Sequence, residues 1–438
     1  MAKKIYQVDE KVPKKMLLPL SIQHLFAMFG ATVLVPFLFG INPAIVLLMN
    51  GIGTLLFILI TGGKAPAYLG SSFAFLAPGN AIIAQFGYEY ALGGFIAVGF
   101  CGCLLAFIIK KFGTDWISIV LPPAAMAPVV ALIGLELSGS AASTAGLLDP
   151  AVSTANVIVF LVTLGVAIVG SVCFRKFLAV IPILIAVVCG YITALCFGLV
   201  DFTPVLEASF FQLPNFTAPK FDMNAIMMML PVLLVIASEH IGHQIVTSQI
   251  VGRDLVKNPG LDKTLFADNF STMISGFVGS VPTTTYGENI GVMALTGVYS
   301  VQVIGGAAVI SIICSFIGPL AALIQTIPNA VIGGISFLLY GMIGVSGLRI
   351  LIDEKVDFGN SVNMILTSVV FVTGLSGITL TIGSTSLSGM ILAALVAMGL
   401  SLVFYVFDKL DWLNKEEAEE PENEFTELAE QVRSENSK

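Results

Sequence analysis

The chain has 438 residues, of which 56% are hydrophobic and only 11% are charged. Soluble domains carry about 25% charged residues, so this composition excludes an ordinary soluble globule and predicts a membrane protein. The net charge of −8 comes mostly from residues 408–438, which carry four basic and eleven acidic side chains, so no basic surface for nucleic acid is expected.

Fourteen apolar stretches follow one another along the chain, and most approach the roughly 20 residues that a helix needs to cross a bilayer. The first seven lie near residues 17–40, 43–61, 67–87, 91–109, 115–137, 153–172 and 178–198. The second seven lie near residues 223–249, 265–280, 281–297, 299–325, 327–347, 362–382 and 388–407. We therefore expect an all-α polytopic membrane protein with fourteen transmembrane segments in a lipid bilayer.

The distribution of basic residues supports this count independently of hydropathy. Loops after even-numbered segments contain ten Lys and Arg residues, whereas loops after odd-numbered segments contain only Lys220. Cytoplasmic loops are enriched in Lys and Arg, so the even-numbered loops are predicted to be cytoplasmic. Residues 1–16 and the acidic tail 408–438 are then cytoplasmic as well, and the protein is expected to be a multi-pass protein of the cytoplasmic membrane.

The third and tenth segments occupy corresponding places in two halves of seven segments, and an odd number per half requires an inverted repeat. Both are poor membrane helices: residues 68–80 and 281–291 are short, rich in hydroxyl groups and interrupted by Gly or Pro. Irregular backbone at membrane depth is tolerated only where it packs in protein or lines a cavity. The pair predicts a binding site near the middle of the membrane, with two purely structural re-entrant segments as the alternative.

Two carboxylates, Glu239 and Glu288, lie deep within predicted segments, where a charge is costly and usually serves transport or proton relay. All three histidines lie in predicted segments too. His243 follows Glu239 by four residues and shares its helix face, which favours a role in proton coupling. His240 points elsewhere and is expected to form a helix-packing hydrogen bond, and His24 stands between these two interpretations.

These groups can together bind a planar, neutral solute, because carboxylates accept N–H bonds and the backbone N–H groups of the broken segments donate to carbonyls. Phe73 and Tyr286 can supply apolar or stacking walls. Many polar solutes fit this description, so these residue types alone do not select one. The sequence offers no metal cluster and no nucleophile with its base, and we expect a transporter that is not an enzyme and needs no metal or cofactor.

The segment Glu288-Asn-Ile-Gly-Val-Met-Ala-Leu-Thr-Gly297 resembles the signature of the nucleobase/ascorbate transporter family, the nucleobase–cation symporters that include bacterial uracil permeases. Residues 21–30, 68–75 and 238–243 are also similar to uracil permeases, and the resemblance extends over residues 10–410. Gly297 lies where some uracil permeases carry a basic residue, so no role for a positive charge is expected at that position.

The resemblance implies a core domain from segments one to four and eight to eleven, a gate domain from the other segments, and short antiparallel strands in the two broken segments. The boundaries are then 17–109 and 223–325 for the core, and 115–198 and 327–407 for the gate. It also implies proton-coupled uptake of uracil by alternating access of the core against the gate, and a homodimer formed through the gate domains.

The resemblance assigns roles to several of these residues, and the residue types discussed above indicate the others. Glu239 and Glu288 are expected to hydrogen-bond the nucleobase, with backbone N–H groups from Phe73 and Gly287, and Tyr286 completes the binding set. Proton coupling is expected to involve Glu239, His243 and Glu288. Supporting or gating positions are expected at His24, Ser72, Asn289 and Tyr340.

Two alternatives stay open. A xanthine or uric acid permease of the same family is disfavoured only by Glu in place of Gln at position 288. An anion transporter of the related sulfate-type fold is disfavoured more strongly, because two carboxylates at the midplane without a Lys or Arg would repel an anion.

Overall fold

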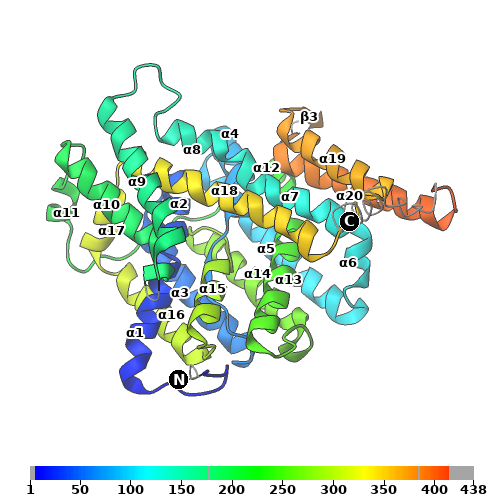
Figure 1. Ribbon diagram of the computed structural model, residues 1–438, viewed down its shortest axis with the longest axis horizontal. Helices are drawn as coiled ribbons and strands as arrows, with labels where there is room; N and C mark the ends of the chain where they lie inside the picture. Colours follow the sequence, from blue (N-terminus) through cyan, green and yellow to red (C-terminus); the bar gives the residue numbers. More distant parts are fainter. Residues whose placement is uncertain (1–4, 176–177, 383–384, 414–438) are drawn as a thin grey trace, which may run out of the picture.

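The computed structural model describes residues 5–175, 178–382 and 385–413. Within these ranges the chain is mostly helical, with two small sheets of two strands each (Figure 1). Residues 1–4 and the part of the acidic tail from 414 to 438, both expected to be cytoplasmic, lie outside the described residues.

In the described part of the chain, eight helical stretches are apolar and long enough to cross a membrane. They are α1–α2 (Lys14–Ala27 and Phe29–Phe39), α3 (Pro43–Ile60), α5 (Tyr88–Phe112), α7–α8 (Pro123–Glu136 and Ser138–Thr144), α9 (Thr154–Cys173), α12–α13 (Met223–Met229 and Val232–Val251), α18 (Asn329–Asp353) and α20 (Gly389–Lys409). Four shorter apolar stretches accompany them, namely η1–α4 (Phe73–Phe75 and Leu76–Phe86), α10 (Pro182–Cys196), α16 (Val301–Ser315) and α19 (Ser361–Leu375). This is a polytopic, membrane-type fold.

The remaining elements connect or interrupt these helices. The helical ones are α6 (Asp115–Val120), η2 (Leu178–Val180), α11 (Thr203–Glu207), η3 (Val256–Gly260), α14 (Leu261–Val278), α15 (Gly287–Thr296) and α17 (Gly318–Gln325). The strands are β1 (Leu69–Ser71), β2 (Thr283–Thr285), β3 (Thr379–Ile382) and β4 (Thr385–Ser388), with β3 and β4 paired antiparallel.

The first and eighth predicted segments, which correspond in a seven-plus-seven arrangement, are each divided into two helices. α1 and α2 meet at Met28, whose sulfur accepts a hydrogen bond from Thr32 Oγ1 (2.6 Å). α13 begins directly after Pro231, and proline has no N–H to continue the hydrogen bonds of a preceding turn. Neither segment is the single helix that its hydropathy predicts.

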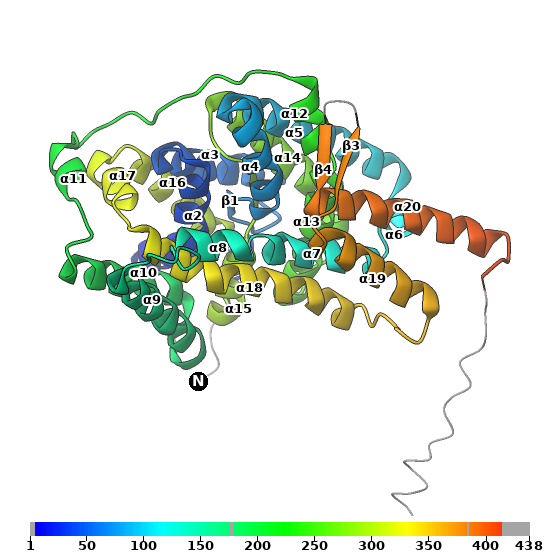
Figure 2. The ribbon, with the colours of Figure 1, turned by 90° about the horizontal axis from the view of Figure 1, so that it is seen from above.

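The helices form two groups that lie side by side (Figure 2). In one group, α5 packs on α14, while α3 and α1 pack on α16. In the other, α7 packs on α18 and α19, and α9 packs on α10 and α18. Small residues permit these close approaches: a Cβ atom on Gly99 of α5 would lie 2.7 Å from the Met273 nitrogen, and one on Gly347 of α18 would lie 2.6 Å from Ala131 Cα.

Two short strands from distant parts of the chain pair inside the first group. β1 and β2 are antiparallel and buried, with Leu69 opposite Thr285 and Ser71 opposite Thr283. β1 packs against α3, and β2 packs against α14 and α13. The strand pair therefore joins the two segments that were expected to be irregular.

Threonine hydroxyls from neighbouring helices form hydrogen bonds with the backbone of the first residue of each strand. Leu69 N–H donates to Thr54 Oγ1 of α3 (2.9 Å), and Thr283 N–H donates to Thr272 Oγ1 of α14 (3.1 Å). Thr272 also donates to the Thr283 carbonyl (2.8 Å). Backbone polar groups without partners are costly at membrane depth, so these side chains stabilise strands inside a helical body.

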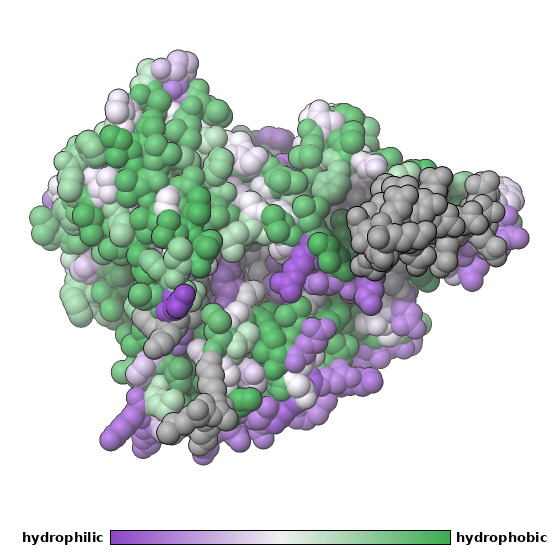
Figure 3. All heavy atoms as spheres, in the orientation of Figure 1, coloured by the Kyte–Doolittle hydropathy of each residue, from purple (hydrophilic) through white to green (hydrophobic). Residues whose placement is uncertain are grey.

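The surface of the molecule is apolar over large areas. Figure 3 shows apolar side chains over most of the upper left of one face, and hydrophilic side chains along its lower edge. Exposed large apolar residues come from several helices, among them Phe107 of α5, Leu161 of α9 and Val372 of α19. Soluble proteins rarely expose contiguous apolar surface on this scale, so the surface fits a lipid environment, in agreement with the composition.

Candidate binding site at the paired strands

Each strand of the β1–β2 pair leads into a helix. η1 begins at Phe73 directly after Ser72, and α15 begins at Gly287 directly after Tyr286. The first N–H groups of a helix have no partner within the helix, which suits helix starts to hold a carbonyl oxygen or an anion. The two helix starts follow opposite ends of a ladder that pairs three residues of each strand.

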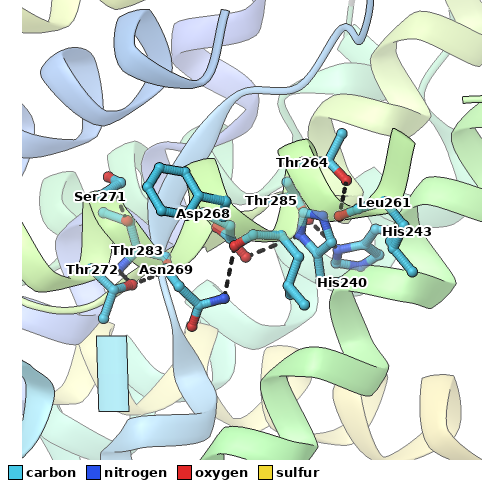
Figure 4. Close-up of polar contacts among 12 residues, drawn as sticks. His240, His243, Leu261, Thr264, Asp268, Asn269, Ser271, Thr272, Thr283 and Thr285 are labelled. Atoms are coloured by element: carbon cyan, nitrogen blue, oxygen red, sulfur yellow. Dashed lines mark hydrogen bonds and ion pairs between the residues drawn. The ribbon is translucent and has the colours of Figure 1, made fainter. Parts of the chain in front are cut away.

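α13, which carries Glu239, brings His243 to the strand pair. His243 Nδ1 lies 3.0 Å from Thr285 Oγ1 at the end of β2 (Figure 4). Its other ring nitrogen, Nε2, lies 3.6 Å from the point that a Cβ atom on Gly287 would occupy. The hydrogen bond that the structure shows for the His243 side chain thus goes to β2, although the sequence placed His243 on the same helix face as Glu239.

Glu288 lies in the first turn of α15. Gly287 and Glu288 are exposed, whereas Tyr286 and Asn289 on either side are buried. Glu288 is therefore accessible within the segment where the sequence places it.

A third carboxylate, Asp268 of α14, is absent from the predicted site residues although it is buried. Its Oδ2 lies 3.0 Å from His240 Nδ1, and the two side chains are 4% and 0% exposed (Figure 4). His240 thus forms the helix-packing hydrogen bond expected of it, between α13 and α14. Asp268 lies near the start of a predicted segment, where sequence reasoning expects an acid to reach water. The neighbouring Asn269 is the signal that could have found it, since adjacent polar residues inside a membrane helix need interior partners.

α1 contacts the start of α15. Asn289 Nδ2 donates to the His24 carbonyl (3.1 Å) and lies 3.0 Å from His24 Nδ1. Both side chains are 1% exposed. The structure therefore brings these two predicted supporting residues together in one buried contact next to Glu288.

An aromatic contact connects the two helix groups. The rings of Phe73 in η1 and Tyr340 in α18 meet edge to face, with centroids 6.3 Å apart. Tyr340 is buried and Phe73 is partly buried. The predicted gate residue therefore lies beside the start of η1.

Tyr286 and Ser72 hold the strand pair together. The Tyr286 hydroxyl donates to the Ser71 carbonyl (3.0 Å), and a Cβ atom on Gly70 would lie 2.8 Å from Tyr286 Cδ2. Ser72 is fully buried, and its N–H donates to the Pro282 carbonyl (2.9 Å). The Tyr286 ring therefore covers β1, and glycine at position 70 leaves the room that this ring needs.

Several buried polar atoms around the strand pair have no hydrogen-bond partner within the described residues. They include Ser71 Oγ, Ser72 Oγ, Ser238 Oγ, Glu239 Oε2, Thr284 Oγ1 and Asn289 Oδ1. Buried polar atoms in proteins are nearly always hydrogen-bonded, so their concentration here is typical of a site that binds a polar molecule.

A polar site with carboxylates, held by two broken segments inside a body of apolar helices, defines a multi-pass membrane protein of the transporter class. The sequence model described as "Permease family" matches residues 15–383 of this chain. The chain belongs to this family, and its resemblance to the nucleobase symporters is thereby confirmed.

Curated relatives cover nearly the whole chain. The uracil permease of Escherichia coli is 54% identical over 413 residues, which are 94% of this chain and 96% of the relative. The uracil permease of Bacillus subtilis is 46% identical over 396 residues, which are 87% of this chain and 91% of the relative. Both names denote transporters, which points away from an enzyme.

Solved structures share the fold at low sequence identity. The inward-facing murine Solute Carrier 26 family member A9 anion transporter has a TM-score of 0.70 at 12% identity, over 91% of this chain and 70% of that chain. The transmembrane domain of the cyanobacterium bicarbonate transporter BicA has a TM-score of 0.56 at 16% identity, over 93% of this chain and all of that domain. At these identities the likeness concerns the fold alone.

Proposed function

We propose that this chain imports uracil together with protons across the cytoplasmic membrane. The observation that carries the proposal is the 54% identity, over 94% of the chain, to a relative named uracil permease. The geometry supports it, since η1 and α15 start beside the strand pair and Glu288 lies in the first turn of α15.

Uracil is a planar, uncharged ring with N–H donors and carbonyl acceptors. In the proposed complex, Glu239 and Glu288 accept hydrogen bonds from ring N–H groups, and the backbone N–H groups of Phe73 and Gly287 donate to the ring carbonyls. Two observations support these roles: Glu239 Oε2 is buried without a partner in the described chain, and Glu288 is accessible at a helix start. Tyr286 contributes by keeping β1 and β2 together.

Proton coupling is assigned to Glu239, His243 and Glu288. A carboxylate taken out of water is disfavoured in its charged form, so a protonated carboxyl group beside a neutral ring stabilises the loaded site. His243 contacts Thr285 at 3.0 Å, two residues before Gly287. A change in the protonation of His243 can therefore reach the backbone that binds the substrate.

The proposal includes fourteen membrane segments in a seven-plus-seven inverted repeat. The matching roles of two threonines support it, since Thr54 of the second segment and Thr272 of the ninth each bind the first residue of a strand. The divided helices of the first and eighth segments are a second correspondence. Both termini are then cytoplasmic.

Alternating access follows from the two helix groups. We assign residues 17–109 and 223–325 to a core domain, and residues 115–198 and 327–407 to a gate domain that also forms a homodimer. The packing of α5 on α14 and of α7 on α18 supports this division. In transport the core moves against the gate, with the Phe73–Tyr340 contact at the boundary and the buried His24–Asn289 pair supporting the core side.

Uptake into proteoliposomes tests the proposal. Vesicles with a more alkaline interior should accumulate labelled uracil, a protonophore should abolish the accumulation, and unlabelled uracil should compete more strongly than xanthine. Glu239→Gln should lose accumulation, while Glu207→Gln, the same change at an exposed carboxylate of α11, should keep it. Uptake indifferent to unlabelled uracil refutes the substrate. Proton-driven accumulation by Glu239→Gln refutes its coupling role.

A further inference from the structure

Residues 5–12 form a strap, here called the N-terminal strap, beside α15 and α16 (Figure 1). Tyr6 N–H donates to the Gly297 carbonyl (2.9 Å), Tyr299 N–H donates to the Tyr6 carbonyl (2.8 Å), and Val301 N–H donates to the Val8 carbonyl (3.0 Å). These bonds fix the strap along the connection between the two helices.

The side chains of the strap alternate as in an edge strand. Tyr6 and Val8 are buried, at 7% and 0% exposure, whereas Ile5 and Asp9 are exposed. Alternate residues of an extended chain point to opposite sides. The strap therefore has an inner face that packs into the protein, and it is not merely a charged extension.

The strap and α1 together hold α15 at both ends. Tyr6 binds the residue that follows α15, and His24 of α1 binds Asn289 in its first turn. α15 has ten residues, and helices shorter than about 12 residues are marginal on their own. Its orientation, and with it the position of Glu288, therefore depends on the contacts at its ends.

The strap also contacts the end of α13, which carries Glu239. Arg253 Nη2 donates to Asp9 Oδ1 (2.7 Å), and Gln7 Nε2 donates to the Val251 carbonyl (3.4 Å). The same short stretch of chain thus joins the ends of the two helices that carry the proposed substrate carboxylates.

We propose that the N-terminal strap is a positioning element of the substrate site, which sets α15 and Glu288 relative to α13 and Glu239. The inference rests on the proposed function for the role of these carboxylates. At about 1.5 Å per helical residue, Glu288 lies about 12 Å along the axis from the end of α15 that the strap holds. Loss of the strap releases one end of this short helix, so it moves the carboxylate without touching it.

The test removes the buried anchor of the strap with Val8→Ser. The matched control is Val159→Ser, the same change at an equally buried valine of α9. Two readouts are measured on the full chain in detergent: hydrogen exchange of the amides at 287–296, and the dissociation constant for uracil. Val8→Ser should speed exchange in α15 and weaken uracil binding at least about fivefold, the low end for coupled sites. Val159→Ser should leave both near the parent values, and Val8→Ile should retain them.

The ion pair provides a second route if Val8→Ser does not yield folded protein. Asp9→Arg places two guanidinium groups side by side and should change both readouts in the same direction, by less than Val8→Ser because the pair is exposed. Adding Arg253→Asp should restore them. Exchange in α15 that stays at the parent rate overturns the inference even when the parent binds uracil. If the parent protein instead fails to bind uracil and the variant still shows faster exchange in α15, the result supports the positioning of α15 by the strap and refutes the proposed function.

Discussion

The buried contact between His240 and Asp268 makes the stability of this protein sensitive to a single side chain. His240→Ala removes the ring that binds Asp268 Oδ2, and Asp268 Oδ1 has no hydrogen-bond partner among the described residues. The variant therefore leaves a carboxyl group, 4% exposed in its side chain, without a protein partner for either oxygen.

The size of the effect follows from this burial. Removing the partner of a buried carboxylate costs about 3–5 kcal/mol. Asp268→Asn keeps an amide that can donate to or accept from His240 Nδ1, so it should lose only about the 0.5–1.5 kcal/mol of an ordinary hydrogen bond. We expect His240→Ala to be the less stable of the two by about 2 kcal/mol or more.

Thermal unfolding of the purified variants in one detergent checks this order. The double variant His240→Phe with Asp268→Leu is the control, because replacing a buried pair with apolar residues is often neutral. Phe57, whose ring centroid lies 6.4 Å from that of His240, offers the new ring an aromatic neighbour. If the double variant is as unstable as His240→Ala, the loss comes from packing and the reasoning from an unpaired carboxyl group is refuted.

Three further predictions concern the strands, the helix packing and the strap. Thr272→Val removes two hydrogen bonds to β2 and should cost about 1–3 kcal/mol, seen as a lower melting temperature; an unchanged melt contradicts it. Gly99→Val should separate α5 from α14 and reduce the folded fraction in size-exclusion chromatography, whereas Gly165→Val, with no atom within 4 Å of the new Cβ, should not; equal losses contradict the packing argument. The Arg253 hydrogen bond lowers the pKa of Asp9 below its usual value. Its stabilisation is therefore present above the unfolded pKa of about 4 and is lost as pH falls through the lower folded value. The small difference in melting temperature between the parent and Asp9→Asn should shrink on acidification, and a difference that grows contradicts this sign.

The sequence was informative about side chains and backbone segments that are energetically costly inside a membrane. Glu239 and His243 stood out because ionisable groups are rare in apolar segments, and the structure places His243 at the strand pair. The irregular composition of residues 68–80 and 281–291 likewise indicated broken segments, and each contains a three-residue strand. These features depend on local composition, which a sequence displays directly.

Features that depend on distant contacts could not be predicted in the same way. Nothing local to Leu69 indicates that its partner is Thr285, more than 200 residues away. Val8 lies in a charged terminal stretch, and its burial arises from the connection between α15 and α16. The break at Met28 has no proline at that position, so hydropathy alone joined α1 and α2 into one helix.

The β1–β2 pair has a consequence for how the protein is made. A membrane protein enters the bilayer from its N-terminal end as it is synthesised, so β1 is in place long before β2 exists. Until Thr283–Thr285 arrives, the backbone groups of β1 that face β2 lack their ladder partners. The first half of the chain is therefore a folding intermediate with unpaired backbone groups in β1. Water, lipid headgroups or the insertion machinery must provide hydrogen-bond partners for these groups until the second half is inserted.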